Sequence, residues 1–406
     1  MKDKKQNKRI NGGHRLLFFC ILCLFGLYVA VSYAEEQPQR EQSKTKVILL
    51  HTDNLTYDQY RHPGAQILTG NVQFQHDGVL MYCDSACFYE ATNSFDAFGH
   101  VKMGQGDTLD LVGDMLLYNG LDQLARVRHN VVLTHRESKL YTDSLDYDRL
   151  YELGYFFEGG KLVDKDNVLT SDWGQYSPPT RQAVFNYNVK LENPKFTLIS
   201  DTLNYNTLTS MAEIVGPSNI DRGDNHIYSE SGFYNTQTEE AILLDRSIVT
   251  NKGRKMVGDS LYYDSKSGVG EGFRNVVYTD EVNKNMLTGN YCYYNDSTGY
   301  SMATDSAVAI DYSQRDTMYM HADTFKVYTF YMDTDSMYRE VRGYHKVRSY
   351  RMDVQSVCDS LVFDSRDTCI TMYRDPIVWN GGQQVLGEVI KVYLNDSTID
   401  RIHVID

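Results

Sequence analysis

One phrase of nine residues recurs along the chain and constrains its fold more than any other feature. It reads LYTDSLDYD at 140–148, LISDTLNYN at 198–206, MVGDSLYYD at 256–264 and SVCDSLVFD at 356–364. Looser copies align on one acidic or amide residue, here called the anchor, and the anchors lie 29 to 36 residues apart. This period predicts a repeat protein in which each unit buries its apolar face against its neighbours. The twelve anchors are Asp53, Asp84, Asp114, Asp143, Asp172, Asp201, Glu230, Asp259, Asn290, Asp323, Asp359 and Glu388.

The residues that follow each anchor have the pattern of a β-strand. The second is usually small or apolar, and the fourth is aromatic in ten of the twelve units. Side chains two positions apart in a strand point to the same face, so these two positions should share one sheet face. Asp or Asn often follows at the fifth position, as at Asp148 and Asn206. Because these residues start turns, the strand should end there, with the anchor acids as turn and rim residues at its start.

A second phrase, a small or polar residue before Val, recurs later in each unit. Examples are GNV at 70–72, GHV at 99–101 and RNVVY at 274–278. We expect it to end a second strand, which gives two short antiparallel strands per repeat and roughly two dozen in all. No long window places apolar residues at helical spacing. The sequence therefore predicts an elongated all-β protein of about twelve two-strand repeats.

The N-terminus has the pattern of an export signal. Basic residues precede an apolar stretch at 16–31, and Ser32, Tyr33 and Ala34 follow it. This pattern predicts a signal peptide over residues 1–34, with an uncleaved membrane anchor over 16–33 as the alternative. Residues 35–46 should form a polar linker, and residues 47–406 the repeats, with a possible break into two subdomains near 290–325.

Charge and motifs exclude several function classes. A net charge of −14 disfavours binding to nucleic acid through the overall field. The local basic cluster at 339–351 is an exception, and a solvated surface strand is its simpler interpretation. No nucleophile motif, dinucleotide motif, P-loop or zinc spacing is present, so we expect no enzyme, no cofactor and no metal. The five cysteines after residue 34 should be core residues, although one disulfide stays open: Cys83, Cys87, Cys292, Cys358 and Cys369.

The repeated apolar face has two interpretations that periodicity does not separate. It is either the sealed core of a sandwich or β-helix, or an apolar groove between two sheets that takes acyl chains. The candidate groove residues lie at the second and fourth positions after an anchor: Leu55, Tyr57, Leu116, Tyr118, Leu145, Tyr147, Leu203, Tyr205, Leu261, Tyr263, Leu361 and Phe363.

The phrases TDSLDYD at 142–148, SDTLNYN at 200–206 and GDSLYYD at 258–264, with LTGNVQF at 68–74 and FGHVKM at 98–103, resemble the OstA/LptA family of lipopolysaccharide transport proteins. The resemblance covers about 47–406 through many weak copies. It implies a bent, V-shaped β-jellyroll with an apolar interior for lipid A acyl chains. This chain is about twice as long as the family's soluble bridge protein, and no barrel-sized segment follows the repeats.

The resemblance implies a non-enzymatic periplasmic protein that shields lipopolysaccharide acyl chains on their way to the outer membrane. Its implied partners are lipopolysaccharide or lipid A and other jellyroll transport proteins at the inner and outer membranes, joined by edge-strand pairing, with self-association also possible. If residues 16–33 stay uncleaved, the protein would be tethered to the inner membrane. Two alternatives stay open: an envelope scaffold without ligand, and a carbohydrate-binding or adhesive β-helix.

Overall fold

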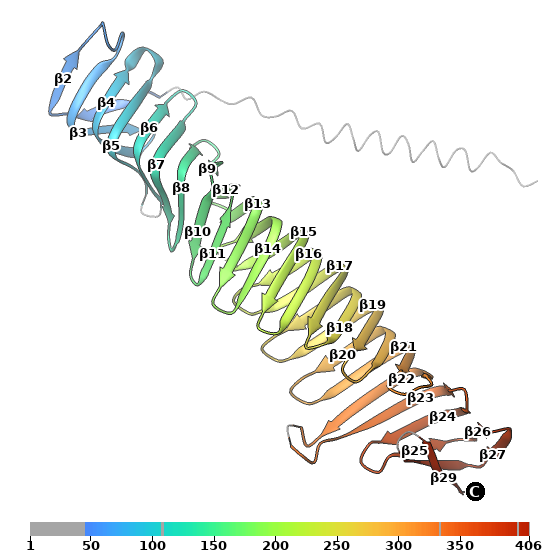
Figure 1. Ribbon diagram of the computed structural model, residues 1–406. Coiled ribbons are helices and arrows are strands. Elements are labelled where there is room, and N and C mark those ends of the chain that lie inside the picture. Colours follow the sequence, from blue (N-terminus) through green and yellow to red (C-terminus); the bar gives the residue numbers. More distant parts are fainter. Residues whose placement is uncertain (1–44, 107–108, 333, 396–397, 406) are drawn as a thin grey trace, which may run out of the picture. The chain divides into compact units, whose positions relative to one another are not determined.

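The structure is a computed structural model that describes residues 45–406 except 107–108, 333, 396–397 and 406. The predicted signal peptide and most of the predicted linker lie outside these residues. Within them there is no helix long and apolar enough to cross a membrane. Residues 45–406 form one compact unit. Its strands follow one another in sequence order along the unit (Figure 1).

The described part holds 29 strands and one 3₁₀ turn, η1 (Glu90–Thr92), and every strand pair is antiparallel. The strands are β1 (Ile48–His51), β2 (Asn54–Tyr57), β3 (Gln66–His76), β4 (Val79–Tyr89), β5 (Ser94–Gln105), β6 (Leu109–Asn119), β7 (Leu124–His135), β8 (Ser138–Asp148), β9 (Leu153–Phe156), β10 (Gly160–Asp164), β11 (Asn167–Ser171), β12 (Trp173–Ser177), β13 (Gln182–Asn193), β14 (Phe196–Asn206), β15 (Met211–Arg222), β16 (Asn225–Asn235), β17 (Glu240–Asn251), β18 (Arg254–Asp264), β19 (Val269–Asp280), β20 (Asn285–Asn295), β21 (Tyr300–Asp311), β22 (Met318–Phe330), β23 (Tyr338–Tyr350), β24 (Val354–Asp364), β25 (Cys369–Tyr373), β26 (Ile377–Asn380), β27 (Gln383–Leu386), β28 (Val389–Asn395) and β29 (Thr398–Ile405).

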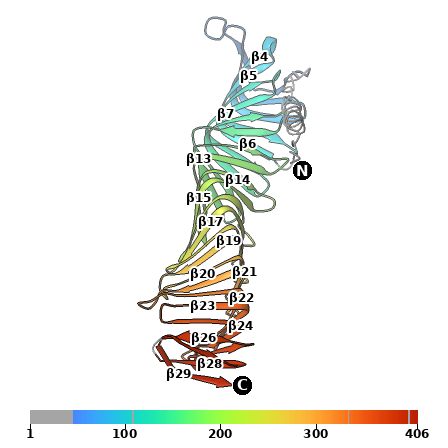
Figure 2. The same ribbon diagram turned by 90° about the vertical axis from the view of Figure 1, so that its right-hand side faces the viewer.

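Most strands bend at their middle, and the bend divides the fold into two facing sheets. In β14 residues 196–200 precede the anchor Asp201 and residues 202–206 follow it, and the pairing register shifts between them. We call the sheet of segments before the anchor sheet 1 and the sheet of segments after it sheet 2. β1, β10, β11, β26 and β27 belong to sheet 1 alone, and β2, β9, β12, β25, β28 and β29 to sheet 2 alone. Figure 2 shows the strand pairs in order from β4 to β29.

The second recurring phrase forms this bend rather than a strand end. In β3 the phrase is Gly70-Asn71, and both residues adopt left-handed φ angles, +83° and +47°. A side chain at Gly70 would also meet Asp53, so a residue without a Cβ fits best there. In β13 the left-handed pair is Tyr187 and Asn188. A β-bulge re-aims a strand in this way, so the two predicted short strands of a unit are in fact long bent ones.

The anchors lie at the same bends instead of at strand starts, which corrects that part of the prediction. Asn188 donates a hydrogen bond from Nδ2 to Asp172 Oδ2 at 2.6 Å. Asn130 does the same to Asp114 Oδ2 at 2.7 Å, and His100 pairs with Asp84. These anchors therefore tie one bend to the bend of the next strand. Most anchors are exposed rim residues, as the sequence indicated.

The predicted strand ends are confirmed. β8 ends at Asp148 and β14 at Asn206, each at the fifth position after its anchor. Asn206 Oδ1 accepts the backbone N–H groups of Leu208 and Thr209 at 2.9 and 3.0 Å. These side-chain bonds close the turn that leads to the next strand. The predicted fold class, an all-β jellyroll built from antiparallel repeats, is confirmed.

Candidate functional site

The inner face between the two sheets is apolar along the whole unit, but its burial changes partway along the chain. From β3 to β17 (residues 66–251) almost every inward side chain is fully buried, and we call this the clasped section. From β18 to β28 (residues 254–395) many inward side chains are only half-buried, and we call this the open section. The two sheets are joined at the bends and part at the opposite ends of the strands. The difference in burial depends on contacts across this edge, where the sheets part.

Polar side chains join the two sheets across that edge in the clasped section. Tyr205, the fourth residue after its anchor in sheet 2, donates from its hydroxyl to Asp164 Oδ2 in sheet 1 at 2.8 Å. Asn167 Nδ2 donates to the Tyr205 hydroxyl and to Thr236 Oγ1, each at 2.9 Å. Burial, and then the negative charge of Asp164, raises the pKa of Tyr205, so its hydroxyl keeps its proton and donates.

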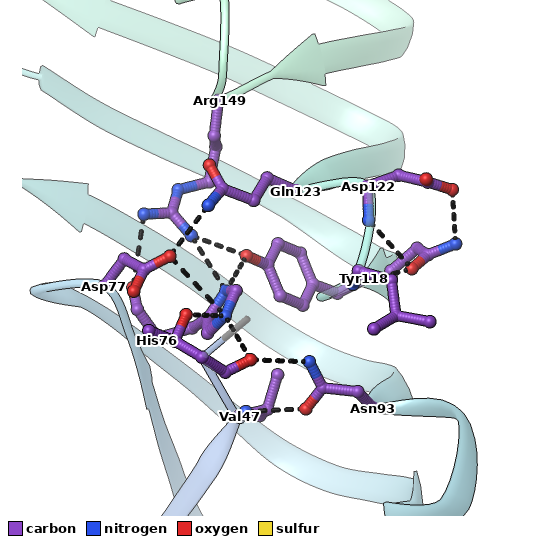
Figure 3. Close-up of polar contacts among 11 residues, drawn as sticks. Val47, His76, Asp77, Asn93, Tyr118, Asp122, Gln123 and Arg149 are labelled. Atoms are coloured by element: carbon purple, nitrogen blue, oxygen red, sulfur yellow. Dashed lines mark hydrogen bonds and ion pairs between the residues drawn. The ribbon is translucent and has the colours of Figure 1, made fainter. Parts of the chain in front are cut away.

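A similar clasp lies near the start of the unit (Figure 3). Arg149 Nη1 donates to the Tyr118 hydroxyl at 2.5 Å, and that hydroxyl pairs with His76 Nδ1 at 2.7 Å. All three side chains are buried. Burial, with the Arg149 charge as a further cause, lowers the pKa of His76. The Nδ1 atom of a neutral His76 can accept a hydrogen bond from the Tyr118 hydroxyl, and this bond completes the bridge between the sheets.

The chain itself closes this end of the edge. The Val47 backbone N–H donates to Asn93 Oδ1 at 2.7 Å, and Asn93 Nδ2 donates to the Thr45 carbonyl at 3.1 Å. Thr45 Oγ1 lies 2.9 Å from His76 Nε2. The segment 45–47 therefore crosses from one sheet to the other beside the Tyr118 clasp (Figure 3).

The last clasp marks the boundary with the open section. Glu239 forms ion pairs with Lys195 and with Arg222 Nη2, the latter at 2.7 Å, and accepts a hydrogen bond from Ser265 Oγ at 2.9 Å. The Lys195 hydrogen bond holds the pKa of Glu239 below its usual value. Beyond this point, in the part of the chain that the structure describes, no side chain at the fourth position after an anchor hydrogen-bonds to sheet 1.

The open section has a buried floor and half-exposed walls. Near the bends, small residues such as Gly258, Gly289, Ala303 and Ala322 fill the floor. A side chain on Gly258 would approach Leu261 to 2.8 Å, so the sheets meet closely there. Farther from the bends, the inward residues of both sheets are half-buried: Met256, Tyr263, Tyr278, Leu287, Tyr294, Ala309, Met320, Val327, Val341, Val354, Phe363 and Ile370. Solvent therefore reaches two facing apolar walls.

The twelve candidate residues fall into three groups. Six are in the sealed core of the clasped section: Leu116, Tyr118, Leu145, Tyr147, Leu203 and Tyr205. Four are in the open section, with Leu261 and Leu361 on the floor and Tyr263 and Phe363 on the sheet 2 wall. Leu55 and Tyr57, in the end strand β2, are 49% and 63% exposed. Whether any of them holds lipid stays a prediction.

The sequence analysis missed the sheet 1 wall. Met256, Leu287 and Met320 each lie three residues before an anchor, in strands β18, β20 and β22. The signal was present, because the recurring phrase begins with an apolar residue at this position in most copies, as Leu140 and Leu198 show. The prediction took this apolar position as part of one short strand and did not assign it to the inner face of a second sheet.

Cysteines and acidic groups add no further chemistry to the described part. The five cysteines there are free and buried, so the disulfide left open by the sequence does not form. Burial raises the pKa of the Cys83 thiol to about 12. Among the described residues no group of three or more His, Cys, Asp or Glu side chains could hold a metal ion.

The fold and the two-walled inner face define a repeat-built β-jellyroll with an apolar interior. A family model described as OstA-like protein matches residues 44–201 and 195–259, more than half of the chain. The chain therefore belongs to the OstA-like protein family, and the resemblance read from its sequence is confirmed.

The crystal structure of LptH from Pseudomonas aeruginosa, the LptA homologous periplasmic component of the lipopolysaccharide transport device, is similar over 38% of this chain and 94% of that chain. The identity is 16% and the TM-score is 0.23. Comparison with curated proteins gave no match.

Proposed function

We propose that this protein is a non-enzymatic, periplasmic lipid-binding protein of lipopolysaccharide transport, and that it holds acyl chains on the inner face of its open section. One observation carries the proposal. Two facing rows of apolar side chains are half-exposed between the sheets. They include Met256, Leu287 and Met320 on one wall and Tyr263, Val341 and Phe363 on the other. Membership of the OstA-like family supports it.

The physical argument starts from the cost of that exposure. Apolar surface in water costs about 25 cal/mol per Å², and soluble proteins rarely keep a long apolar face uncovered without a ligand or partner. An acyl chain is linear and apolar, and each buried CH₂ contributes about 0.8 kcal/mol. Walls built from repeated, similar side chains provide many nearly equivalent contacts instead of one deep site. Such a surface suits a lipid that must move along the protein.

The proposed partners are jellyroll transport proteins at the inner and outer membranes. Within the described residues, β1 and β2 pair only with β3 at one end of the unit, and at the other end β27 pairs only with β26 and β29 only with β28. Free strand edges of this kind accept a strand from another chain. Edge pairing would continue both sheets into a neighbouring jellyroll, including a second copy of this protein.

The clasped section favours a second, structural role for residues 66–251. Its inner face is filled by its own side chains, and the clasps at Tyr205, Tyr118 and Glu239 hold its sheets together. An envelope scaffold without ligand remains the alternative for the whole protein if the open section binds no lipid.

Native mass spectrometry with lipopolysaccharide tests the proposal. We expect the protein to carry bound lipid and Leu287→Asp to lose at least tenfold in affinity, because a carboxylate would then lie on an acyl-chain wall. Asp245→Asn, at an exposed bend, is the matched control and should bind normally. Full binding by a folded Leu287→Asp variant, or no uptake by the unmodified protein, would leave only the scaffold role.

A further inference from the structure

Two tyrosine clasps of the clasped section end on a histidine. His76 in β3 bonds to Tyr118 in β6, and Nδ1 of His135 in β7 lies 2.8 Å from the Tyr176 hydroxyl in β12. Both imidazoles are more than nine-tenths buried. The Tyr205 clasp ends on a carboxylate instead. Because imidazole changes its charge near neutral pH, the part of the section that the histidines close should respond differently to acid.

The hydrogen bonds around His76 require a neutral ring (Figure 3). Nε2 lies 2.9 Å from Thr45 Oγ1 and 3.3 Å from the Thr45 carbonyl, so we assign the ring proton to Nε2. Nδ1 accepts from the Tyr118 hydroxyl at 2.7 Å and from Arg149 Nη1 at 3.3 Å. A second proton on the ring would turn Nδ1 into a donor and remove both bonds.

Arg149 makes a charged His76 unfavourable. The guanidinium is buried, and no carboxylate among the described residues forms an ion pair with it. All its side-chain hydrogen bonds in this part of the chain go to His76 or Tyr118, and its Nε has no partner there. An imidazolium 3.3 Å from this guanidinium would place two like charges together in a buried site. Protonation therefore favours a state in which the two side chains separate.

Asp77 is the acid that opposes this effect. Its carboxylate lies 3.6 Å from His76 Nε2 and accepts a hydrogen bond from Gln123 at 2.7 Å. Burial, the largest cause, lowers the pKa of His76, while Asp77 raises it and Arg149 lowers it. The net shift is downward. The ring is therefore harder to protonate in the closed clasp than in an open one, where it regains its ordinary pKa.

The clasp at His135 has similar surroundings. The charged groups near the ring are Arg181, Arg136 and Glu152, and Glu152 accepts a hydrogen bond from Gln105 at 2.7 Å. Burial, and then the charges of Arg181 and Arg136, lower the pKa of His135, while Glu152 opposes them. Acid therefore acts on both clasps in the same direction.

Behind the Tyr118 clasp the inner face is aromatic and apolar. The Phe95 ring lies 5.2 Å from that of Tyr118, and Phe74 stacks on Phe95 at 4.1 Å between centroids. Leu111 and Leu133 continue the same buried core. Parting the sheets here would uncover an apolar face like the one that is already accessible in the open section.

We propose that acid opens the N-terminal part of the clasped section, β3–β8, by protonating His76 and His135, and that the uncovered inner face then takes an acyl chain. The opening does not depend on the proposed function, whereas the choice of an acyl chain as occupant rests on it. Below pH 6.5 the equilibrium constant for opening should rise by up to about tenfold per pH unit for each histidine, because the open state binds the proton more readily.

Hydrogen exchange of the full chain at pH 7.5 and 5.0, without ligand, tests the opening. Protection factors corrected for the intrinsic exchange rate are compared between the two pH values. We expect protection in β3–β8 to fall at least about tenfold at pH 5.0, while that in β14–β16, beside the Tyr205 clasp, stays within about twofold. Unchanged protection in β3–β8, or an equal fall in both regions, would overturn the proposal.

Substitution of both histidines assigns the response. The double variant His76→Asn/His135→Asn keeps an acceptor near each Nδ1 position but gains no proton, so protection in β3–β8 should be the same at both pH values. His321→Asn, at an exposed position in β22, is the matched control and should respond like the unmodified protein. An acid response that persists in the double variant would overturn the proposal. If circular dichroism shows that this variant does not fold, His76→Gln/His135→Gln replaces it.

Tyr118→Phe tests whether the clasp itself holds the sheets. It removes the hydroxyl that joins His76 to Arg149 and adds no titrating group. Protection in β3–β8 should therefore already be lower at pH 7.5 than in the unmodified protein. Unchanged protection in this variant would show that the clasp does not close the section, which would also overturn the proposal.

An uncharged apolar fluorophore, N-phenyl-1-naphthylamine, tests the occupant. The unmodified protein should bind about twice as much dye at pH 5.0 as at pH 7.5, since a second apolar face is uncovered, and the double variant should show no such gain. Leu287→Asp should bind less dye at pH 7.5 but keep the gain in acid. A gain in acid without binding at pH 7.5 would support the inference and contradict the proposed function. Opening by hydrogen exchange without a gain of dye would overturn the proposed occupant.

Discussion

The clasped and open sections share one repeat, one bend and one strand order, yet they differ in how their sheets meet. In the clasped section Tyr205, Tyr118 and Tyr176 each hydrogen-bond to the facing sheet, across the edge where the sheets part. The core between the sheets is sealed there. In the open section the same position holds Tyr294, Val327 or Phe363, which form no such bond, and the walls are half-exposed. Polar contacts across one edge therefore accompany the packed core, and the described residues of the open section, where these tyrosine bonds are not formed, present an accessible apolar surface.

The largest expected difference between the sections concerns core truncation. Leu198 and Leu287 are equivalent residues on the sheet 1 wall, but Leu198 is fully buried and Leu287 is half-buried. Leu198→Ala should destabilise its section by about 3 kcal/mol, because it leaves a cavity. Leu287→Ala should cost about 1 kcal/mol, because solvent already reaches it. Hydrogen exchange read by mass spectrometry on β13–β15 and β19–β21 measures both, and equal losses would contradict the division.

Removal of one clasp hydroxyl should have the next largest effect. Tyr205→Phe keeps the ring but leaves Asp164 and Asn167 without their shared partner, which should cost about 1–3 kcal/mol. Tyr294→Phe is the control, because its hydroxyl bonds to Asp296 on its own side of the edge. Exchange rates in β10–β16 should rise only in the first variant. An unchanged rate there would mean that the clasp does not hold the sheets.

Acid should loosen the clasped section through His76. Its pKa is lowered mainly by burial, so below pH 6.5 the unfolded chain binds a proton that folded His76 does not. Stability should then fall by up to about 1.4 kcal/mol per pH unit as the pH drops from 6.5 to the folded pKa, and level off below it. His76→Gln should flatten this slope in urea unfolding between pH 7 and 5. A slope that is the same in both proteins would assign the pH dependence to other groups.

The smallest effects should come from the polar pairs at the bends, which occur in both sections. Asp172→Ala removes the exposed partner of Asn188, and Asp259→Ala removes a half-buried carboxylate that pairs with both Asn275 and Arg246. Each should cost about 0.5 kcal/mol, as is usual for exposed polar pairs. Thermal unfolding followed by circular dichroism measures the loss. A loss of more than about 2 kcal/mol in one section only would show that the bends also differ.

Local patterns in the sequence predict much of this fold. The period of the anchors predicts the repeat, and the alternation of Leu203 and Tyr205 predicts the inner face of sheet 2. Asp148 and Asn206 mark strand ends through bonds to backbone groups two and three residues away. The strand and turn signals depend on neighbours in the chain, so each repeat contains its own, and only the period needs several repeats.

The clasps could not be predicted in this way. Arg149 and His76 are 73 residues apart, and Asp164 and Tyr205 are 41 apart. The sheet 1 partners of Tyr118, Tyr176 and Tyr205 lie 42, 41 and 41 residues before them, which is longer than one repeat, so the pattern within a single repeat does not mark them. The bend was also missed, because a left-handed pair such as Tyr187-Asn188 contains no glycine and reads as ordinary strand sequence. The division into a sealed and an accessible section follows from these non-local contacts.

The most direct test of the central claim is hydrogen exchange of the full chain with and without lipopolysaccharide. If acyl chains enter only the open section, backbone amides of β18–β24 should become protected, while those of β6–β15 should exchange at the same rate in both states. Protection that is equal in the two sections, or confined to the clasped section, would contradict the account, because lipid would then have to part the sheets that the clasps hold together.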